Sequence, residues 1–76
     1  MLVKDLIDNI FSHNEIIAIW EDREEDGNAF HYLLWRGMAW DLKDKQPHLY
    51  NSKFQRIFGT IPQSITHADT INILIA

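Results

Sequence analysis

Carboxylates in one short segment are the groups of this sequence best placed to do chemistry. Residues 21–26 contain five acids and one base, a net charge of −4: Glu21, Asp22, Arg23, Glu24, Glu25 and Asp26. The whole chain also carries −4, so the other residues are neutral in sum. Such a cluster is either a solvated hairpin tip or an anionic surface that docks on a basic site of a partner protein. In the second case the carboxylates imitate nucleic-acid phosphates and steer association.

Metal binding is the first alternative for these acids, and the pattern argues against it. Counted from Asp22, acids stand at positions 1, 3 and 5 and Gly27 at position 6, as in a calcium loop, but position 12 is Leu33 instead of a bidentate Glu. Four histidines are 17–19 residues apart, without the spacing of a preformed metal site: His13, His31, His48 and His67. We therefore expect neither a metal nor a cofactor.

Arrangements typical of catalysis do not occur in the sequence. The chain has no cysteine, which excludes thiolate nucleophiles, disulfides and zinc fingers. Its serines lack the context of a nucleophile elbow, and Ser12 and His13 are only neighbours in sequence. Three scattered glycines cannot build a phosphate-binding loop. We expect a protein that is not an enzyme.

A second candidate for binding is the aromatic segment from Trp35 to Trp40, in which Arg36 lies between two tryptophans. Trp, Tyr and Arg dominate binding hot spots, so Trp35, Arg36 and Trp40 are candidate anchors unless they belong to the core. Together with Lys53 and Arg56, the same segment could form a stacking platform for nucleic acid. The acidity of the chain argues against direct nucleic-acid binding, because affinity for phosphates depends on positive charge.

The elements that must position these groups follow from hydrophobic spacing. Apolar residues recur at three- and four-residue intervals over residues 2–11, which predicts an amphipathic helix that ends at residues 12–14. Residues 15–20 and 29–36 are rich in β-branched and aromatic residues and predict two strands. The acidic segment is then the loop of a hairpin, closed by a turn at Asp26-Gly27-Asn28.

The second half of the chain predicts two more strands. Residues 38–42 fit either a strand extension or a helical turn, and the polar residues 43–51 predict a loop. Residues 54–59 alternate as in a third strand, and a turn region around Pro62 leads to a β-branched strand at 70–75. We expect that last strand to be central; at an edge it would favour homodimerisation. The prediction is one α+β domain over residues 1–76, with the N-terminal helix packed on a three- or four-stranded antiparallel sheet.

The N-terminus and hydropathy predict where the protein resides. Acids interrupt the apolar residues of the opening segment, and no small-residue cleavage site follows, so it does not resemble a signal peptide. No apolar run approaches the roughly 18 residues of a membrane span. We expect a cytoplasmic protein that does not bind membranes.

Three segments carry a resemblance in layout: the opening at residues 1–7 (MLVKDLI), residues 36–42 (RGMAWDL) and the ending at 69–73 (DTINI). In these the chain resembles short, mostly uncharacterised proteins of phages and mobile elements of Gram-positive bacteria. Some small acidic proteins of that group are anti-CRISPR inhibitors, which fill the DNA-binding groove of a nuclease with acidic side chains. The resemblance implies a small inhibitor with a protein partner, and it assigns no role to any single residue.

Overall fold

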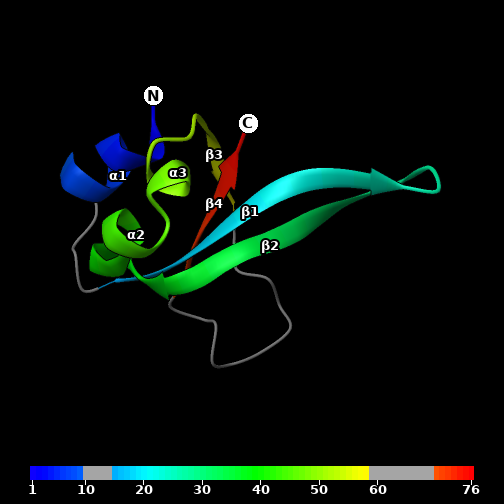
Figure 1. Cartoon of the computed structure of the whole chain (residues 1–76). Coiled ribbons are helices and arrows are strands. Elements are labelled where there is room, and N and C mark those ends of the chain that lie inside the picture. Colours follow the sequence, from blue (N-terminus) through cyan, green and yellow to red (C-terminus); the bar gives the residue numbers. More distant parts are fainter. Residues whose placement is uncertain (10–14, 59–69) are drawn as a thin grey trace.

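Four strands and three short helices make up the part of the chain that the structure describes, residues 1–9, 15–58 and 70–76 of a computed structural model (Figure 1). The helices are α1 (Val3–Asn9), α2 (Ala39–Lys45) and α3 (Pro47–Tyr50). The strands are β1 (Ile16–Glu25), β2 (Asn28–Met38), β3 (Phe54–Phe58) and β4 (Ile71–Ile75). The expected α+β class is confirmed.

The sheet has the strand order β2-β1-β4-β3. Antiparallel pairing joins β1 to β2, as the predicted hairpin requires, and also joins β3 to β4. The expected all-antiparallel sheet is wrong, because β4 runs parallel to β1 and the sheet is mixed. The C-terminal strand is central, as its apolar sequence predicts, and Ile73 and Leu74 are fully buried there. β1 and β4 are the two central strands, and each has one parallel and one antiparallel neighbour. β2 and β3 are the edge strands.

The main core lies between the helices and one face of the sheet. From α1 the buried side chains are Val3, Leu6 and Ile7, whose spacing places them on one helical face. They pack with apolar residues of the other helices and of the central strands: Ile17, Ile19, Ala39, Leu42, Leu49, Tyr50 and Ile73. The predicted helix therefore exists from residue 3 to 9, while its predicted end at residues 12–14 lies outside the described residues.

Residues 43–51 are not the loop that their polarity predicts. The chain turns helical at Ala39, directly after β2, and α3 begins at Pro47 after a break at Gln46. Proline fits the first position of a helix because the N–H it lacks has no partner there. The buried residues of these two helices are Ala39, Leu42, Leu49 and Tyr50. This also decides between the alternatives for residues 38–42, of which all but Met38 are helical.

The acidic segment is part of a strand and not a loop. Glu25 pairs with Asn28, so only Asp26 and Gly27 form the turn, with φ of 52° and 81°. Two consecutive positive φ values are those of a type I′ turn, which joins antiparallel strands without splaying them. The turn lies where it was expected, but it is shorter, and the acids before it continue β1. β3 confirms the third predicted strand, whereas the turn region at 61–69 lies outside the described residues.

Candidate functional site

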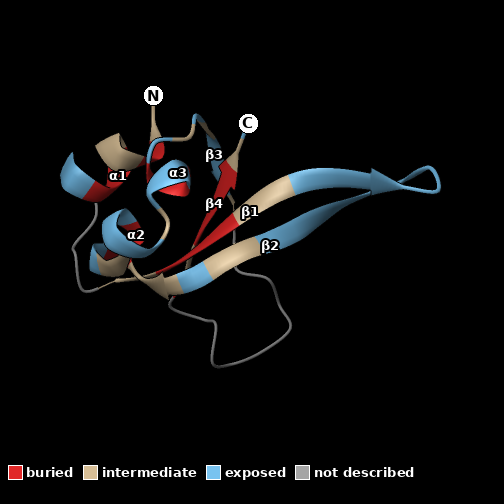
Figure 2. Cartoon of the chain, in the orientation of Figure 1, coloured by how far each residue is buried: buried red, intermediate tan, exposed pale blue. Residues whose placement is uncertain are grey.

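The hairpin continues beyond the sheet as a two-stranded ribbon (Figures 1 and 2). β4 pairs with β1 only as far as Glu21, whereas β1 and β2 stay paired to Glu25 and Asn28. We call residues 21–32 the arm. All of its residues except Glu21, which is half-buried, are exposed. This exposure makes the arm the candidate site.

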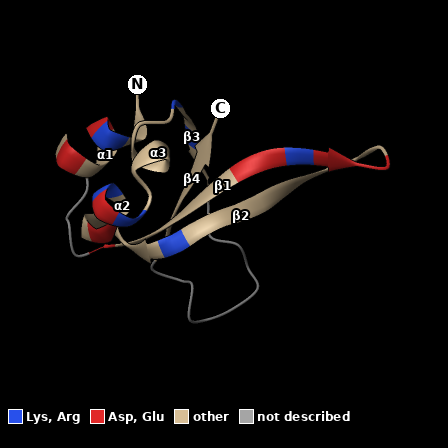
Figure 3. Ribbon diagram, viewed as in Figure 1, with Lys and Arg blue, Asp and Glu red and all other residues tan. Residues whose placement is uncertain are grey.

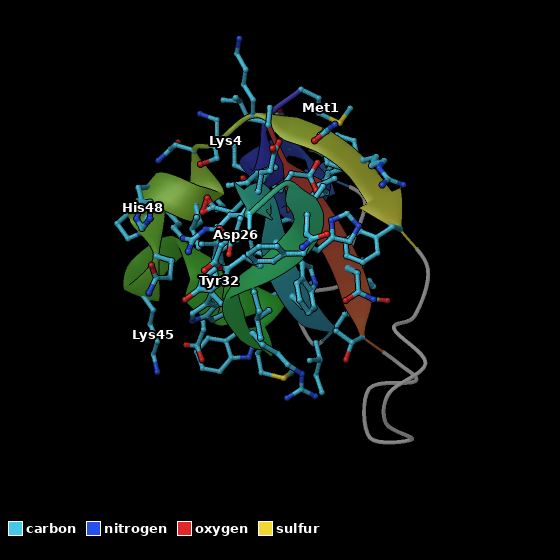
Figure 4. All side chains as sticks on the ribbon, turned by 90° about the vertical axis from the view of Figure 1, so that its right-hand side faces the viewer. Met1, Lys4, Asp26, Tyr32, Lys45 and His48 are labelled. Atoms are coloured by element: carbon cyan, nitrogen blue, oxygen red, sulfur yellow. The ribbon has the colours of Figure 1, made fainter. Side chains whose placement is uncertain are left out.

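Side chains of the arm alternate between two faces, so the acids are divided between them. One face carries Glu21, Arg23 and Glu25 of β1, with Asn28, Phe30 and Tyr32 of β2 opposite them. We call it the Tyr32 face. The other, the His31 face, carries Asp22 and Glu24, with Ala29 and His31 opposite them. Asp26 lies at the tip, which points toward the viewer in Figure 4.

Arg23 is engaged by its neighbours on the Tyr32 face. Its guanidinium carbon lies 3.5 Å from the centre of the Tyr32 ring, a cation–π contact. Its Nη2 is 3.1 Å from Oε1 of Glu21. Arg23, the basic residue of the acidic segment, thus pairs with Glu21, the acid nearest the sheet. Among the described residues, Glu24, Glu25 and Asp26 form no ion pair, and the outer half of the arm keeps its full negative charge.

On the His31 face a row of contacts links the arm to the sheet. Nδ1 of His31 lies 2.7 Å from Oδ1 of Asp22, and the His31 ring is 4.9 Å from the ring of Phe58. Phe58 in turn contacts Trp20 edge-on at 5.9 Å between ring centres. Sequence reasoning considered His31 only for a metal or enzymatic site and missed this role. Its place opposite Asp22 becomes visible only once the hairpin register is known.

The three aromatic-segment candidates do not form a common surface. Trp35 is half-buried and packs against the core. Arg36 is exposed beside it on the opposite face of β2, and Trp40 is 52% exposed on α2. Arg36 and Trp40 are therefore available to a partner, whereas Trp35 has a structural role at the base of β2.

Charge is distributed unevenly over the described residues (Figure 3). Acids dominate the arm, while the bases other than Arg23 lie toward the helices and β3: Lys4, Arg36, Lys43, Lys45, Lys53 and Arg56. Lys53 and Arg56 belong to the β3 edge, far along the sheet order from β2. An open hollow on the arm is lined by residues of both strands: Asp22, Arg23, Glu24, Ala29, Phe30 and His31.

Neither a metal-holding cluster nor a membrane-spanning helix is found in the described part of the chain. No three His, Asp or Glu residues there are grouped so that they could hold a metal ion. None of the described helices has the length and apolarity to cross a membrane.

Comparison with known proteins gives no relative: no family model, curated protein or solved structure matches this chain. The function is therefore inferred from the arm itself.

Proposed function

We propose that this protein is a non-enzymatic, cytoplasmic binding module whose acidic arm docks on a basic, nucleic-acid-binding groove of a partner protein. The observation that carries the proposal is the extension of Asp22, Glu24, Glu25 and Asp26 beyond the sheet on an exposed two-stranded ribbon. A ribbon enters a groove more readily than a flat surface does. Carboxylates on both faces and at the tip can then contact both walls of that groove.

Charge spacing supports imitation of a nucleic acid. A β-strand rises about 3.4 Å per residue, and one strand of DNA carries one phosphate per about 3.4 Å. Five acids within residues 21–26 therefore give the arm nearly the charge density of a single nucleic-acid strand, less the charge of Arg23. A groove lined with Lys and Arg to hold phosphates would attract this arm and accelerate its association.

The resemblance in layout to proteins of phages and mobile elements adds a biological role to this proposal. In that role the protein is an inhibitor, comparable to the acidic anti-CRISPR proteins, which competes with nucleic acid for its target. Arg36 and Trp40, both exposed, are secondary anchors at the edge of the contact.

The test is affinity capture from host lysate, followed by competition with DNA on the purified partner. The arm variant carries Glu24→Gln and Glu25→Gln; its matched control carries Asp41→Asn and Asp44→Asn on α2 and changes the net charge by the same amount. We expect the arm variant to bind at least tenfold more weakly and the control to bind like wild type. Binding should also weaken with salt and be displaced by DNA. A partner held equally by both variants and indifferent to DNA would contradict the proposal.

Direct binding of nucleic acid through Trp35, Arg36, Trp40, Lys53 and Arg56 is the alternative. Since Trp35 packs against the core, a stacking platform would have to rely on Trp40 alone. A gel-shift titration of DNA and RNA at low salt tests it; retardation that is lost on changing Lys53 and Arg56 would favour this alternative.

A further inference from the structure

We propose that the outer edge of β2, with which no other described strand pairs, pairs antiparallel with the same edge of a second copy of this chain, so that two arms form one four-stranded ribbon. This interface does not depend on the function proposed above. It uses β2, whereas the acids of the arm belong to β1, apart from Asp26 in the turn.

The arm needs a neighbour more than the rest of the sheet does. An isolated two-stranded ribbon is marginally stable in water, and three or more strands are normally required. Beyond Glu21 the arm has no third strand in the described structure. Its exposed large apolar side chains all lie on β2: Phe30 (39% exposed), Tyr32 (43%), and Leu33 (40%) directly at the base.

Charge selects β2 over β1 as the pairing edge. Both strands of the arm have one open edge, but that of β1 is bordered by acids, which act against strand addition. β2 has eleven residues, and Arg36, near its end, is the only Asp, Glu, Lys or Arg among them. Natural edge strands are usually protected by charge or proline, and residues 28–33 have neither.

The hairpin geometry shows which backbone groups are available. Pairs of antiparallel strands alternate between hydrogen-bonded and non-hydrogen-bonded, and the pair that flanks a two-residue turn, here Glu25 and Asn28, is hydrogen-bonded. Counting along β2, the N–H and C=O groups of Ala29, His31 and Leu33 then point away from β1. These are the groups that a second copy can bind.

A two-fold axis at His31 satisfies these groups and pairs the apolar side chains. Ala29 of each copy then lies opposite Leu33 of the other, and Phe30 lies opposite Tyr32. Each opposed pair lies on one face of the ribbon, as antiparallel pairing requires. The interface is isologous, which is the commonest arrangement in homodimers.

Electrostatics gives the dimer a distinctive salt dependence. In the four-stranded ribbon the two β1 strands are outermost, three strand spacings or about 14 Å apart. This separation exceeds the Debye length of about 8 Å at physiological ionic strength but not the roughly 30 Å at 0.01 M salt. Repulsion between the acids is therefore screened at physiological salt, and the dimer tightens as salt rises. Docking of the arm on a basic partner has the opposite dependence.

The area available predicts a weak dimer. Aromatic side chains cover roughly 150–250 Å² each, so the exposed parts of Phe30, Tyr32 and Leu33 contribute on the order of 500 Å² from both copies. Stable interfaces bury about 1,200–2,000 Å². Self-association is therefore expected at tens to hundreds of micromolar protein.

Sedimentation equilibrium of the purified full chain, over a range of protein concentrations at 0.02 and 0.3 M NaCl, tests the proposal. The interface variant is Ala29→Pro, which removes an N–H that points to solvent in the monomer; Ala29→Thr keeps that N–H and is the control. Phe30→Thr is a second variant that leaves the backbone unchanged. We expect wild type and Ala29→Thr to dimerise about threefold or more tightly at the higher salt, and both other variants to dimerise at least tenfold more weakly. A chain that stays monomeric up to 1 mM, a dimer that salt weakens, or a dimer that both Ala29→Pro and Phe30→Thr keep would each overturn the proposal.

Cross-linking tests the register, because the chain has no cysteine of its own. A His31→Cys variant places two thiols opposite each other at the two-fold axis, whereas Asp22→Cys places them on the outer strands. Mild oxidation should give a covalent dimer at least tenfold faster from the first variant. Equal rates would contradict pairing through β2. Loss of the dimer leaves capture of a basic partner unaffected, so the two proposals fail separately.

Discussion

The indole Nε1 of Trp20 donates a hydrogen bond to Oδ1 of Asn72, 3.0 Å away, between residues 52 positions apart in the chain. Asn72 is 4% exposed and lies on β4, and Trp20 lies on β1, where the arm leaves the sheet. On β1, Trp20 alternates with Ile19, whose side chain belongs to the helix-covered core, so this bond lies on the opposite face. It fastens the base of the arm to the central strand.

Removal of this bond should destabilise the protein. In Asn72→Ala the partly buried indole N–H loses its partner, which costs about 1–3 kcal/mol. Urea unfolding followed by circular dichroism measures the loss. Trp20→Phe in the same background removes the donor as well, so the two changes together should cost about 1 kcal/mol less than their sum. Strict additivity would show that the bond contributes nothing.

Stability at high pH should depend on the contact between Tyr50 and Asp8. The Tyr50 hydroxyl donates a 2.5 Å hydrogen bond to Oδ2 of Asp8 and joins α3 to α1. This bond, with burial and the negative charge of Asp8, raises the pKa of Tyr50 from 10.0 to about 12. The folded state holds the proton more tightly than the unfolded state. The contribution of this bond to the stability of the fold is therefore complete below pH 10 and disappears as the pH rises to about 12.

A Tyr50→Phe variant provides the comparison. It should be less stable than wild type by about 1.5–3 kcal/mol near pH 8, because the bond goes to a charged group, and the two curves should converge between pH 10 and pH 12. Tyr32→Phe keeps the bond between Tyr50 and Asp8, so its free energy of unfolding should fall with rising pH as that of wild type does. Denaturant unfolding at a series of pH values measures this, and a difference that stays constant with pH would be contrary to expectation.

Local sequence patterns were enough to predict most of the strands and α1. These patterns depend only on residues close together in the sequence. The β-branched runs at residues 16–20 and 71–75, for example, form strands in almost any small sheet. The parallel pairing of β1 with β4 could not be predicted, because it joins segments about fifty residues apart. The first half of α2 was left open between a strand and a helical turn. Its second half and α3 were missed because their polar faces and Pro47 resemble a loop, while only Leu42, Leu49 and a few neighbours are buried.

A close contact near the C-terminal end of β2 leads to a third prediction. A Cβ added to Gly37 would lie 2.7 Å from Cζ2 and 2.8 Å from Cη2 of the Trp35 ring. Gly37→Ala should therefore push Trp35 out of its place against the core and cost about 1–3 kcal/mol. Thermal unfolding measures the change. In a Trp35→Leu background the clash is absent, and the same substitution should cost less than 0.5 kcal/mol; an equal cost in both backgrounds would locate the strain elsewhere.

Only the residues of the candidate site, and not their arrangement, could be predicted from the sequence. The sequence identifies the acids, but their division between two faces depends on the two-residue turn and on the alternation of a strand that was expected to be a loop. The half-buried place of Trp35 follows from its register opposite Ile19, after which the pairing shifts by one residue. Such a shift moves side chains to the other face of a strand, and no local pattern in the sequence indicates it.

The turn at the tip of the arm is the last prediction. Gly27 has φ of 81° and no atom near the position of a Cβ, so Gly27→Ala meets no clash but pays for left-handed backbone, about 1–2 kcal/mol. Asp26→Asn should instead favour the turn, because Asn-Gly is preferred in type I′ hairpins. Amide hydrogen exchange should accelerate in the arm of Gly27→Ala while α1 and β4 stay protected, since the arm has few contacts outside β1 and β2. A uniform loss of protection would mean that the arm and the sheet unfold as one unit.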